Sequence, residues 1–219
     1  MLEINHLTFS YHRHPVLKDI TFSVKEGEFV GIIGKNGCGK STLLSILAGV
    51  QKQAAGTILF NDTPLFEKGK APSLKIGYVP QKNPLLTELS VRDNLKLWQQ
   101  EKDPDKITAL LEEMQLKDLL STTVSKLSEG MKKRVSIASV LQNSPRILVM
   151  DESSASLDLP CKDIIHRQLS SFVADGGRVI FTTHEETEFA LCSALYILKD
   201  GVLLPADPSL SKSELVSRF

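Results

Sequence analysis

A glycine-rich segment constrains this chain more than any other feature of its sequence. It reads Gly34-Lys35-Asn36-Gly37-Cys38-Gly39-Lys40-Ser41 and fits the pattern G-x-x-x-x-G-K-[ST]. An apolar run at 29–33 precedes it and a good helix former at 41–48 follows, so the segment is predicted to join a buried strand to a helix. At average glycine usage, a chance match in a chain of this length has odds of about one in a hundred. We therefore interpret the segment as a phosphate-binding loop rather than as a simple glycine turn.

The chemistry of such a loop assigns its residues to parts of a nucleoside triphosphate. Glycines let backbone N–H groups converge on phosphate oxygens, and the helix that begins near Lys40 adds the positive end of its dipole. Lys40 is predicted to neutralise the β- and γ-phosphates, and the hydroxyl of Ser41 to ligate Mg²⁺. The residues predicted to contact the triphosphate are Gly34, Asn36, Gly37, Cys38, Gly39, Lys40, Ser41 and Thr42.

A second apolar strand, at 147–150, ends in Asp151 and Glu152. Ligands bind where the strands of a parallel sheet end. Asp151 is suited to hold Mg²⁺, and Glu152 to polarise the attacking water as a general base. An apolar strand ending in two carboxylates is structural in most proteins, but the phosphate-binding loop upstream reverses that interpretation. The two segments together predict a Mg-ATPase or a GTPase.

The order of apolar patterns predicts the fold class. Alternating positions in the first thirty residues favour antiparallel strands. The rest is α/β: a P-loop NTPase core, mainly parallel sheet with helices, carries this N-terminal antiparallel β subdomain and an inserted α-helical subdomain. We expect one domain over 1–219, with the core and antiparallel part at about 1–80 and 144–219 and the helical subdomain at about 82–143. Beyond the strands and helix above, we expect strands at 57–60, 76–79, 178–182 and 194–199 and helices at 91–100, 105–115, 131–141 and 161–173. The strand that precedes Asp151 is expected to begin at 146.

Further segments resemble the ABC ATPase family, in the family's order and over nearly the whole chain. Leu127-Ser128-Glu129-Gly130-Met131 stands where the family has its signature L-S-G-G-Q. Gln81 is similar to the Q-loop glutamine, and Ala155-Ser156-Leu157-Asp158 to the D-loop. His184 matches the switch histidine, and Tyr11 lies where the family places an aromatic ring that stacks on adenine.

The resemblance implies a mechanism and a set of partners. Two such subunits would pair head to tail, as a homodimer or heterodimer, with each ATP held between one phosphate-binding loop and the partner's Ser128 and Gly130. Each pair would drive a separate transmembrane permease subunit, with Gln81 as the hinge. The implied catalytic residues are Glu152, His184 and Lys40, the implied Mg²⁺ ligands are Ser41, Gln81 and Asp151, and Tyr11 and Gln81 join the residues that bind ATP.

The signature departs from the family pattern at two positions. Glu129 replaces the first glycine and Met131 replaces the glutamine. A carboxylate close to a triphosphate is unfavourable unless its side chain points away. Because Ser128 and Gly130 persist, we expect a working site, although a weakened site in a heterodimer stays open. Met131 followed by Lys132-Lys133-Arg134 resembles the branch of the family that powers exporters.

Composition restricts the other functions of the chain. Lys plus Arg equals Asp plus Glu at 26 each, so no general affinity for nucleic acid or anionic lipid is expected. No apolar stretch could span a bilayer, and no secretory signal is visible. We expect a cytoplasmic protein, peripheral on the inner face of the membrane through its permease, without membrane insertion of its own. A soluble ABC ATPase in cofactor assembly, or in nucleic-acid or ribosome-linked work, stays open; a P-loop kinase would have no use for the signature.

Three local expectations complete the analysis. Cys38 lies near Lys40 and a helix N-terminus, so the pKa of its thiol is predicted to fall, and its alkylation to block ATP binding. Leu85, Leu86 and Trp98 have the apolar character of a docking groove, although a lone helical Trp98 is interpreted as local core. The segment after Pro205 is short and polar, and we assign it no function.

Overall fold

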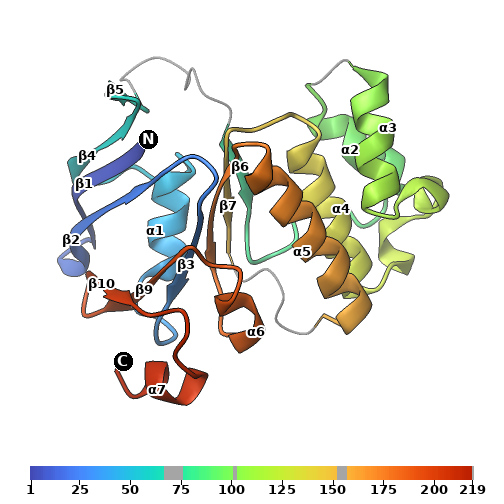
Figure 1. Ribbon diagram of the computed structural model, residues 1–219. Coiled ribbons are helices and arrows are strands. Elements are labelled where there is room, and N and C mark those ends of the chain that lie inside the picture. Colours follow the sequence, from blue (N-terminus) through green and yellow to red (C-terminus); the bar gives the residue numbers. More distant parts are fainter. Residues whose placement is uncertain (67–75, 101–102, 152–156, 219) are drawn as a thin grey trace.

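A ten-stranded sheet organises the molecule in the computed structural model, which describes residues 1–66, 76–100, 103–151 and 157–218. The strand order is β5-β4-β1-β2-β10-β9-β3-β8-β7-β6. Antiparallel strands form one side of the molecule and a group of helices forms the other (Figure 1). The strands are β1 Leu2–Tyr11, β2 His14–Val24, β3 Phe29–Ile33, β4 Ala55–Phe60, β5 Thr63–Pro64, β6 Ile76–Val79, β7 Ile147–Met150, β8 Arg178–Thr182, β9 Ala194–Lys199 and β10 Val202–Ala206.

The central strands are parallel. β3 pairs with β8 and β9, β7 pairs with β8 and β6, and all of these pairs are parallel. Every residue of β3, β7 and β8 is buried, as continuous apolar runs require when helices cover both faces of a sheet. The carboxyl ends of these strands therefore meet at one edge, where α1, Asp151 and the segment after Thr182 begin.

Helices cover the two faces of this sheet. They are α1 Lys40–Leu47, α2 Val91–Trp98, α3 Pro104–Glu113, α4 Glu129–Leu141, α5 Leu159–Ala174, α6 Glu186–Phe189 and α7 Lys212–Val216, with 3₁₀ turns η1 Lys117–Leu119 and η2 Val124–Lys126. Alternate residues of each strand enter two cores. Val30 and Ile32 pack with α1 and the antiparallel strands, whereas Phe29 and Ile33 pack with α5 and with the helical group formed by α2, α3 and α4. The period of two along a strand explains this division.

The helical group lies between β6 and β7 in sequence. Ser90 caps α2 by accepting from the amide of Asp93 at 3.2 Å, and Asp103 caps α3 by accepting from the amide of Asp105 at 3.0 Å. Its apolar side chains form one core with the sheet face that α5 covers. In Figure 1, α4 lies beside α5 while α2 and α3 lie farther from the sheet. The group is thus an insertion that rests on the sheet through α4.

Most predicted elements exist, and their ends differ by a few residues. The strands at 29–33, 76–79, 178–182 and 194–199 are confirmed as predicted. α2 ends at Trp98 rather than at 100, and α4 begins at Glu129 rather than at 131, because Ser128 supplies the cap. β7 begins at Ile147, one residue later than expected.

The chain from Val202 onward is more structured than the polarity of the segment after Pro205 suggested. β10 pairs antiparallel with β9 across a turn at Asp200 and Gly201, both with positive φ. The short helix α7 follows, closed by a capping box between Ser211 and Glu214. Its Leu215 is fully buried in the same core as α5. In the described residues no helix is long and apolar enough to cross a membrane.

Candidate nucleotide site

The glycine-rich loop is held by contacts that leave no room for side chains at two positions. A Cβ on Gly34 would lie 2.5 Å from the carbonyl oxygen of Leu198. Gly39 has φ +109°, and a Cβ there would lie 2.8 Å from Cγ1 of Val16. Glycine at these positions is therefore a steric requirement of the loop's path between β3 and α1.

Lys40 is the best-anchored charged residue of the loop. Its side chain is buried, and Nζ donates to the carbonyl oxygens of Gly34 at 2.8 Å and Lys35 at 3.0 Å. The ammonium is thereby held across the loop. Within the described first turn of α1 there is no acidic residue and no side-chain cap, so its backbone N–H groups face an environment suited to an anion.

A cavity of about 460 Å³ lies over this loop. It gathers residues from five separate parts of the sequence: the end of β1, the start of β2, the loop and first turn of α1, the segment after β6, and the residue that follows β7. Its lining consists of Tyr11, Val16, Asn36, Gly37, Gly39, Lys40, Ser41, Thr42, Gln81 and Asp151. Every residue of this set except Val16 was predicted from the sequence. Val16 belongs to no recognisable motif, and only its packing on Gly39 places it in the lining of the cavity.

Asp151 is a buried carboxylate with defined partners. Its Oδ1 accepts a hydrogen bond of 2.8 Å from the hydroxyl of Thr182, and its amide donates to the carbonyl of Val79 at 2.9 Å. Burial, and then the charge of Asp151, raises the pKa of the neighbouring Tyr78. Sequence reasoning missed Thr182; its signal was a hydroxyl at the end of an apolar strand.

The residues around Asp151 fit a magnesium ion that also contacts a substrate's phosphates. Ser41, Asp151 and Gln81, whose side chains carry a hydroxyl, a carboxylate and an amide oxygen, line the same cavity. Oxygen ligands of this kind suit Mg²⁺, which binds through one or two protein groups plus phosphates and water. The described residues contain no cluster of three His, Cys, Asp or Glu side chains able to hold a metal by itself. With Ser41, Gln81 and Asp151 as protein ligands, a magnesium ion here would complete its coordination with phosphate oxygens and water.

Tyr11 stands at the rim of the cavity. Its ring is about half exposed and packs edge-on against Phe9, with ring centroids 4.8 Å apart. Its hydroxyl donates to Oε1 of Gln51 at 3.2 Å, and the hydroxyl of Ser45 donates to the same oxygen at 3.2 Å. α1 thus fixes the orientation of a ring that is available for stacking.

His184 lies outside the lining of this cavity. It lines a much smaller one, of about 10 Å³, beneath the end of β3. The described residues around that space are Ile33, Thr183, His184, Phe189, Lys212, Leu215 and Val216. The hydroxyl of Thr183 accepts from the amide of Glu185 at 2.9 Å and so fixes the loop after β8. His184 is therefore packed against α7, a contact that the sequence did not suggest.

The segment 127–131 lies at the start of α4, away from the cavity of its own chain. Ser128 caps the helix, its Oγ accepting from the amide of Met131 at 3.2 Å. A Cβ on Gly130 would lie 2.6 Å from Sγ of Cys161 in α5. Glu129 is exposed and pairs with Lys132 at 2.7 Å. Neither Ser128 nor Gly130 is thus brought to the phosphate-binding loop of the same chain.

Glu152, Ala155 and Ser156 lie outside the described residues. Asp158, which follows them, caps α5 by accepting from the amide of Cys161 at 3.0 Å. Hydrogen bonds from Cys161, and then the charge of Arg134, lower the pKa of Asp158.

The predicted fall of the Cys38 pKa is wrong. Burial raises the pKa of this thiol and outweighs the opposing charge of Lys40. The ammonium of Lys40 donates to two loop carbonyls. Cys38 is only partly exposed, and its Sγ packs against Gly34, where an added Cβ would lie 2.9 Å from the sulfur. Desolvation disfavours the thiolate more strongly than the nearby charge favours it.

The interpretation of Trp98 as local core is also wrong. Its side chain is 53% exposed and lines a groove of about 700 Å³ between the helical group and the core. Leu86 is exposed as well, whereas Leu85 is buried. Tyr78, Pro80 and Val140 line the same groove, which therefore presents an apolar surface next to the segment that carries Gln81.

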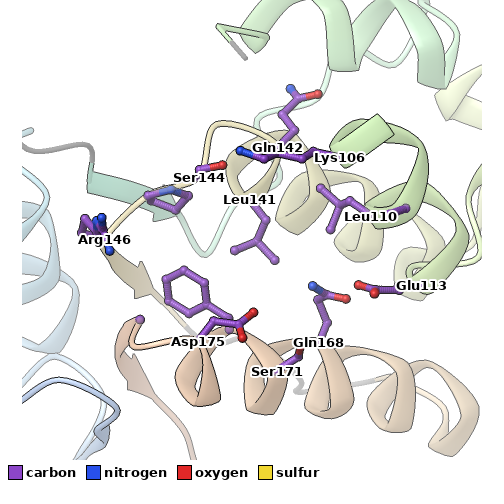
Figure 2. A pocket seen from close by; sticks show the side chains of 14 residues that line it. Lys106, Leu110, Glu113, Leu141, Gln142, Ser144, Arg146, Gln168, Ser171 and Asp175 are labelled. Carbon is purple, nitrogen blue, oxygen red and sulfur yellow. The ribbon is translucent and has the colours of Figure 1, made fainter. Parts of the chain in front are cut away.

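A separate groove, of about 500 Å³, lies on the other side of α4. In Figure 2, Lys106, Leu110 and Glu113 of α3 face Gln168 and Ser171 of α5, and Asp175 just after that helix, across it. Leu141, near the end of α4, lies between the two helices in this view. The facing sides of α3 and α5 are therefore not closely packed, and α4 is the link between the helical group and the core.

Comparison with known proteins identifies relatives of this chain. The family model described as "ABC transporter" matches residues 17–155. The Nod factor export ATP-binding protein I of Rhizobium meliloti is 34% identical over 91% of this chain, which spans 62% of that relative. The chain thus spans about three-fifths of that relative's length. The "Putative hemin import ATP-binding protein HrtA" of Staphylococcus aureus is 37% identical over 85% of this chain and 89% of its own.

Solved structures agree with the sequence comparisons. The ATP-binding subunit of an ABC transporter superposes with a TM-score of 0.87 at 27% identity, over 98% of this chain and 97% of the other. The dimeric structure of MJ0796, a bacterial ABC transporter cassette, gives a TM-score of 0.80 at 26% identity, over 93% of this chain and 96% of the other. The α/β fold with its P-loop core is thus the fold of these cassettes.

Proposed function

The chain belongs to the ABC transporter family, and we propose that it is the subunit that binds and hydrolyses Mg-ATP to drive a transmembrane permease. The observation that carries this proposal is the single cavity into which Tyr11, the phosphate-binding loop, Gln81 and Asp151 converge. These residues come from distant parts of the sequence, and each has a chemical type suited to one part of the nucleotide.

Each side of the cavity has a distinct task in the proposal. Tyr11 stacks on adenine, and its bond to Gln51 keeps the ring oriented. The loop amides and Lys40 bind the phosphates, because a buried, oriented ammonium stabilises negative charge better than a solvated one. Ser41, Gln81 and Asp151 would hold Mg²⁺, which would supply positive charge to neutralise the β- and γ-phosphates.

The proposed hydrolytic residues are Glu152, His184 and Lys40. Glu152 follows directly after Asp151 and acts as general base on the attacking water. His184 donates to the γ-phosphate, which requires its loop to turn from α7 towards the cavity. Thr182 ends β8 and donates to Asp151, and Thr183 and His184 follow it directly, so the proposed metal site and the histidine are supported by the same strand.

A second ATPase subunit completes the proposed site. Ser128 and Gly130 lie at the start of α4 and not on the cavity of their own chain, so they act on the nucleotide of a partner bound head to tail. One solved relative, the bacterial cassette MJ0796, is dimeric, which supports pairing of two cassettes. The partner is a second copy or a related subunit.

The permease is proposed to dock on the apolar groove that contains Trp98 and Tyr78. Pro80 and Pro84, on either side of Gln81 in sequence, line this groove. Loss of the γ-phosphate would therefore be transmitted from Gln81 to the groove through a few residues. The chain is then peripheral on the cytoplasmic face of the membrane, through its partner. Export is favoured by Met131-Lys132-Lys133-Arg134 and by relatives named for Nod factor export, while one relative is named for hemin import.

The proposal is tested with purified chain and its Glu152→Gln variant. We expect Mg-dependent ATP turnover by the wild type, and an ATP-bound dimer without turnover by the variant. Lys40→Ala is the matched negative, since it removes the phosphate-binding ammonium and should abolish both binding and turnover. Wild-type chain that binds no ATP would refute the proposed function. Turnover without any permease recovered from the native membrane would instead favour a soluble ABC ATPase.

A further inference from the structure

The first turn of α4 carries an ion pair at the position where the chain departs from its family. Nζ of Lys132 donates to Oε1 of Glu129 at 2.7 Å, one turn along the helix. The side chain of Lys132 is 19% exposed and that of Glu129 is 72% exposed. The lysine stem is therefore covered by the protein, while the carboxylate stands outermost on the surface.

Such a pair contributes little to stability in water. Exposed ion pairs one helical turn apart are screened and gain little over their hydrated forms. The short distance and the covered stem of Lys132 nevertheless confine the ammonium to the neighbourhood of one carboxylate. A contact of this kind gains weight when another molecule covers the surface and excludes the water that screens it.

The surroundings of Glu129 indicate what would cover it. Ser128, immediately before it, caps α4, and Gly130, immediately after it, is buried against Cys161. Glu129 therefore lies between the two residues proposed to contact the partner's ATP, and Gly130 cannot move away without disturbing α5. An isolated carboxylate here would repel the triphosphate of an approaching partner.

We propose that Lys132 is a specificity-determining residue: by neutralising Glu129, it allows this signature surface to accept the triphosphate held by a second cassette. The inference rests on the proposed head-to-tail dimer. It also explains how a glutamate is tolerated where the family has glycine, because the pair presents almost no net charge. Glycine at position 129 would make the ammonium of Lys132 dispensable.

The test is a charge-rescue cycle in the full-length chain. Lys132→Gln, Glu129→Gly and the double variant are each combined with Glu152→Gln, and ATP-dependent dimerisation is measured by analytical ultracentrifugation at low and high salt. Lys132→Gln should weaken the dimer about tenfold or more at low salt and less at high salt, because salt screens the exposed charge. The double variant should return to within about twofold of the parent, as expected when two residues are coupled. Lys126→Gln removes an equivalent charge six residues earlier and should have no effect.

Binding of a fluorescent ATP analogue to the monomer is measured in parallel and should be unchanged in every variant. Dimerisation of Lys132→Gln equal to that of the parent would overturn the inference. A double variant as defective as Lys132→Gln would also overturn it, since Lys132 would then act on the partner directly rather than on Glu129. A parent that binds ATP without dimerising would refute the dimer itself, a failure visible before any variant is compared.

Discussion

The hydroxyl of Thr182 donates a 2.8 Å hydrogen bond to Oδ1 of Asp151, and both side chains are buried. Thr182 ends β8 and Asp151 directly follows the neighbouring parallel strand β7, so the sheet itself sets their separation. The bond orients a carboxylate that is proposed to hold Mg²⁺ and satisfies one of its lone pairs where water is excluded.

Thr182→Val should therefore weaken the metal site while keeping the shape of the strand. Because second-sphere hydrogen bonds orient metal ligands, we expect the Mg²⁺ concentration for half-maximal ATP hydrolysis to rise about tenfold. Thr182→Ser retains the hydroxyl and should stay near the wild type. A Mg²⁺ titration of ATPase activity measures the difference; an unchanged midpoint in Thr182→Val would contradict the role assigned to this bond.

Gly130→Ala should destabilise the chain although alanine is the better helix former. The new Cβ would lie 2.6 Å from Sγ of Cys161, so α4 or α5 must shift. Overpacking of this kind costs about 1–3 kcal/mol in the free energy of unfolding. Urea denaturation measures this loss, and Cys161→Ala in the same chain should recover much of it by removing the sulfur. Equal losses in the single and double variants would show that the sulfur is not the obstacle.

Cys38 should react slowly with alkylating agents at neutral pH. Burial raises its pKa, so less of the thiol is ionised than in an unfolded chain, and the rate should increase only at more alkaline pH. Iodoacetamide labelling followed by mass spectrometry measures the profile, with Cys38→Ser as the control. Burial raises the pKa of Cys192 to about 12, so this thiol should remain protonated over the pH range in which Cys38 begins to react. ATP should protect Cys38; a profile shifted to lower pH than that of a free thiol would contradict the burial argument.

The same pKa shift has a consequence for stability. The thiol of Cys38 loses its proton more easily in the unfolded chain than in the folded one. Its contribution to stability is therefore complete below the ordinary thiol pKa and is lost as the pH rises from that value through the raised pKa of the folded chain. The free energy of unfolding should fall less steeply with alkaline pH in Cys38→Ser than in the wild type. Parallel pH profiles from chemical denaturation would contradict this.

Leu215→Ala should affect both stability and hydrolysis. This residue of α7 is fully buried in the core, and truncating its side chain should cost about 2–5 kcal/mol in the free energy of unfolding. Because Leu215 and His184 line the same small space, kcat should fall while KM for ATP stays constant. Val216→Ala, in the same helix but half exposed, should change stability by no more than about 0.5 kcal/mol. A kcat equal to that of the wild type would show that the packing of α7 does not influence the role of His184 in hydrolysis.

The elements that sequence patterns predicted well are those whose signal is local. β3, the glycine-rich loop and the start of α1 are continuous in sequence, and their periodicity and spacing express their structure directly. The ends of α2 and α4 were less accurate, because capping side chains and contacts with other elements decide where a helix stops. β10 and α7 were missed, since their burial depends on β9 and on the core below β3 rather than on any pattern of their own.

The sequence by itself determined the chemistry of this protein: the loop, its lysine, the carboxylates after β7 and the order of the motifs are all readable from contiguous residues. Only the tertiary structure decided how those groups meet. It brought Tyr11, Gln81 and Asp151 to one cavity, packed His184 against α7, exposed Trp98 and reversed the expected shift of Cys38. Each of these outcomes depends on burial and distance between remote segments, and such quantities exist only once the chain has folded.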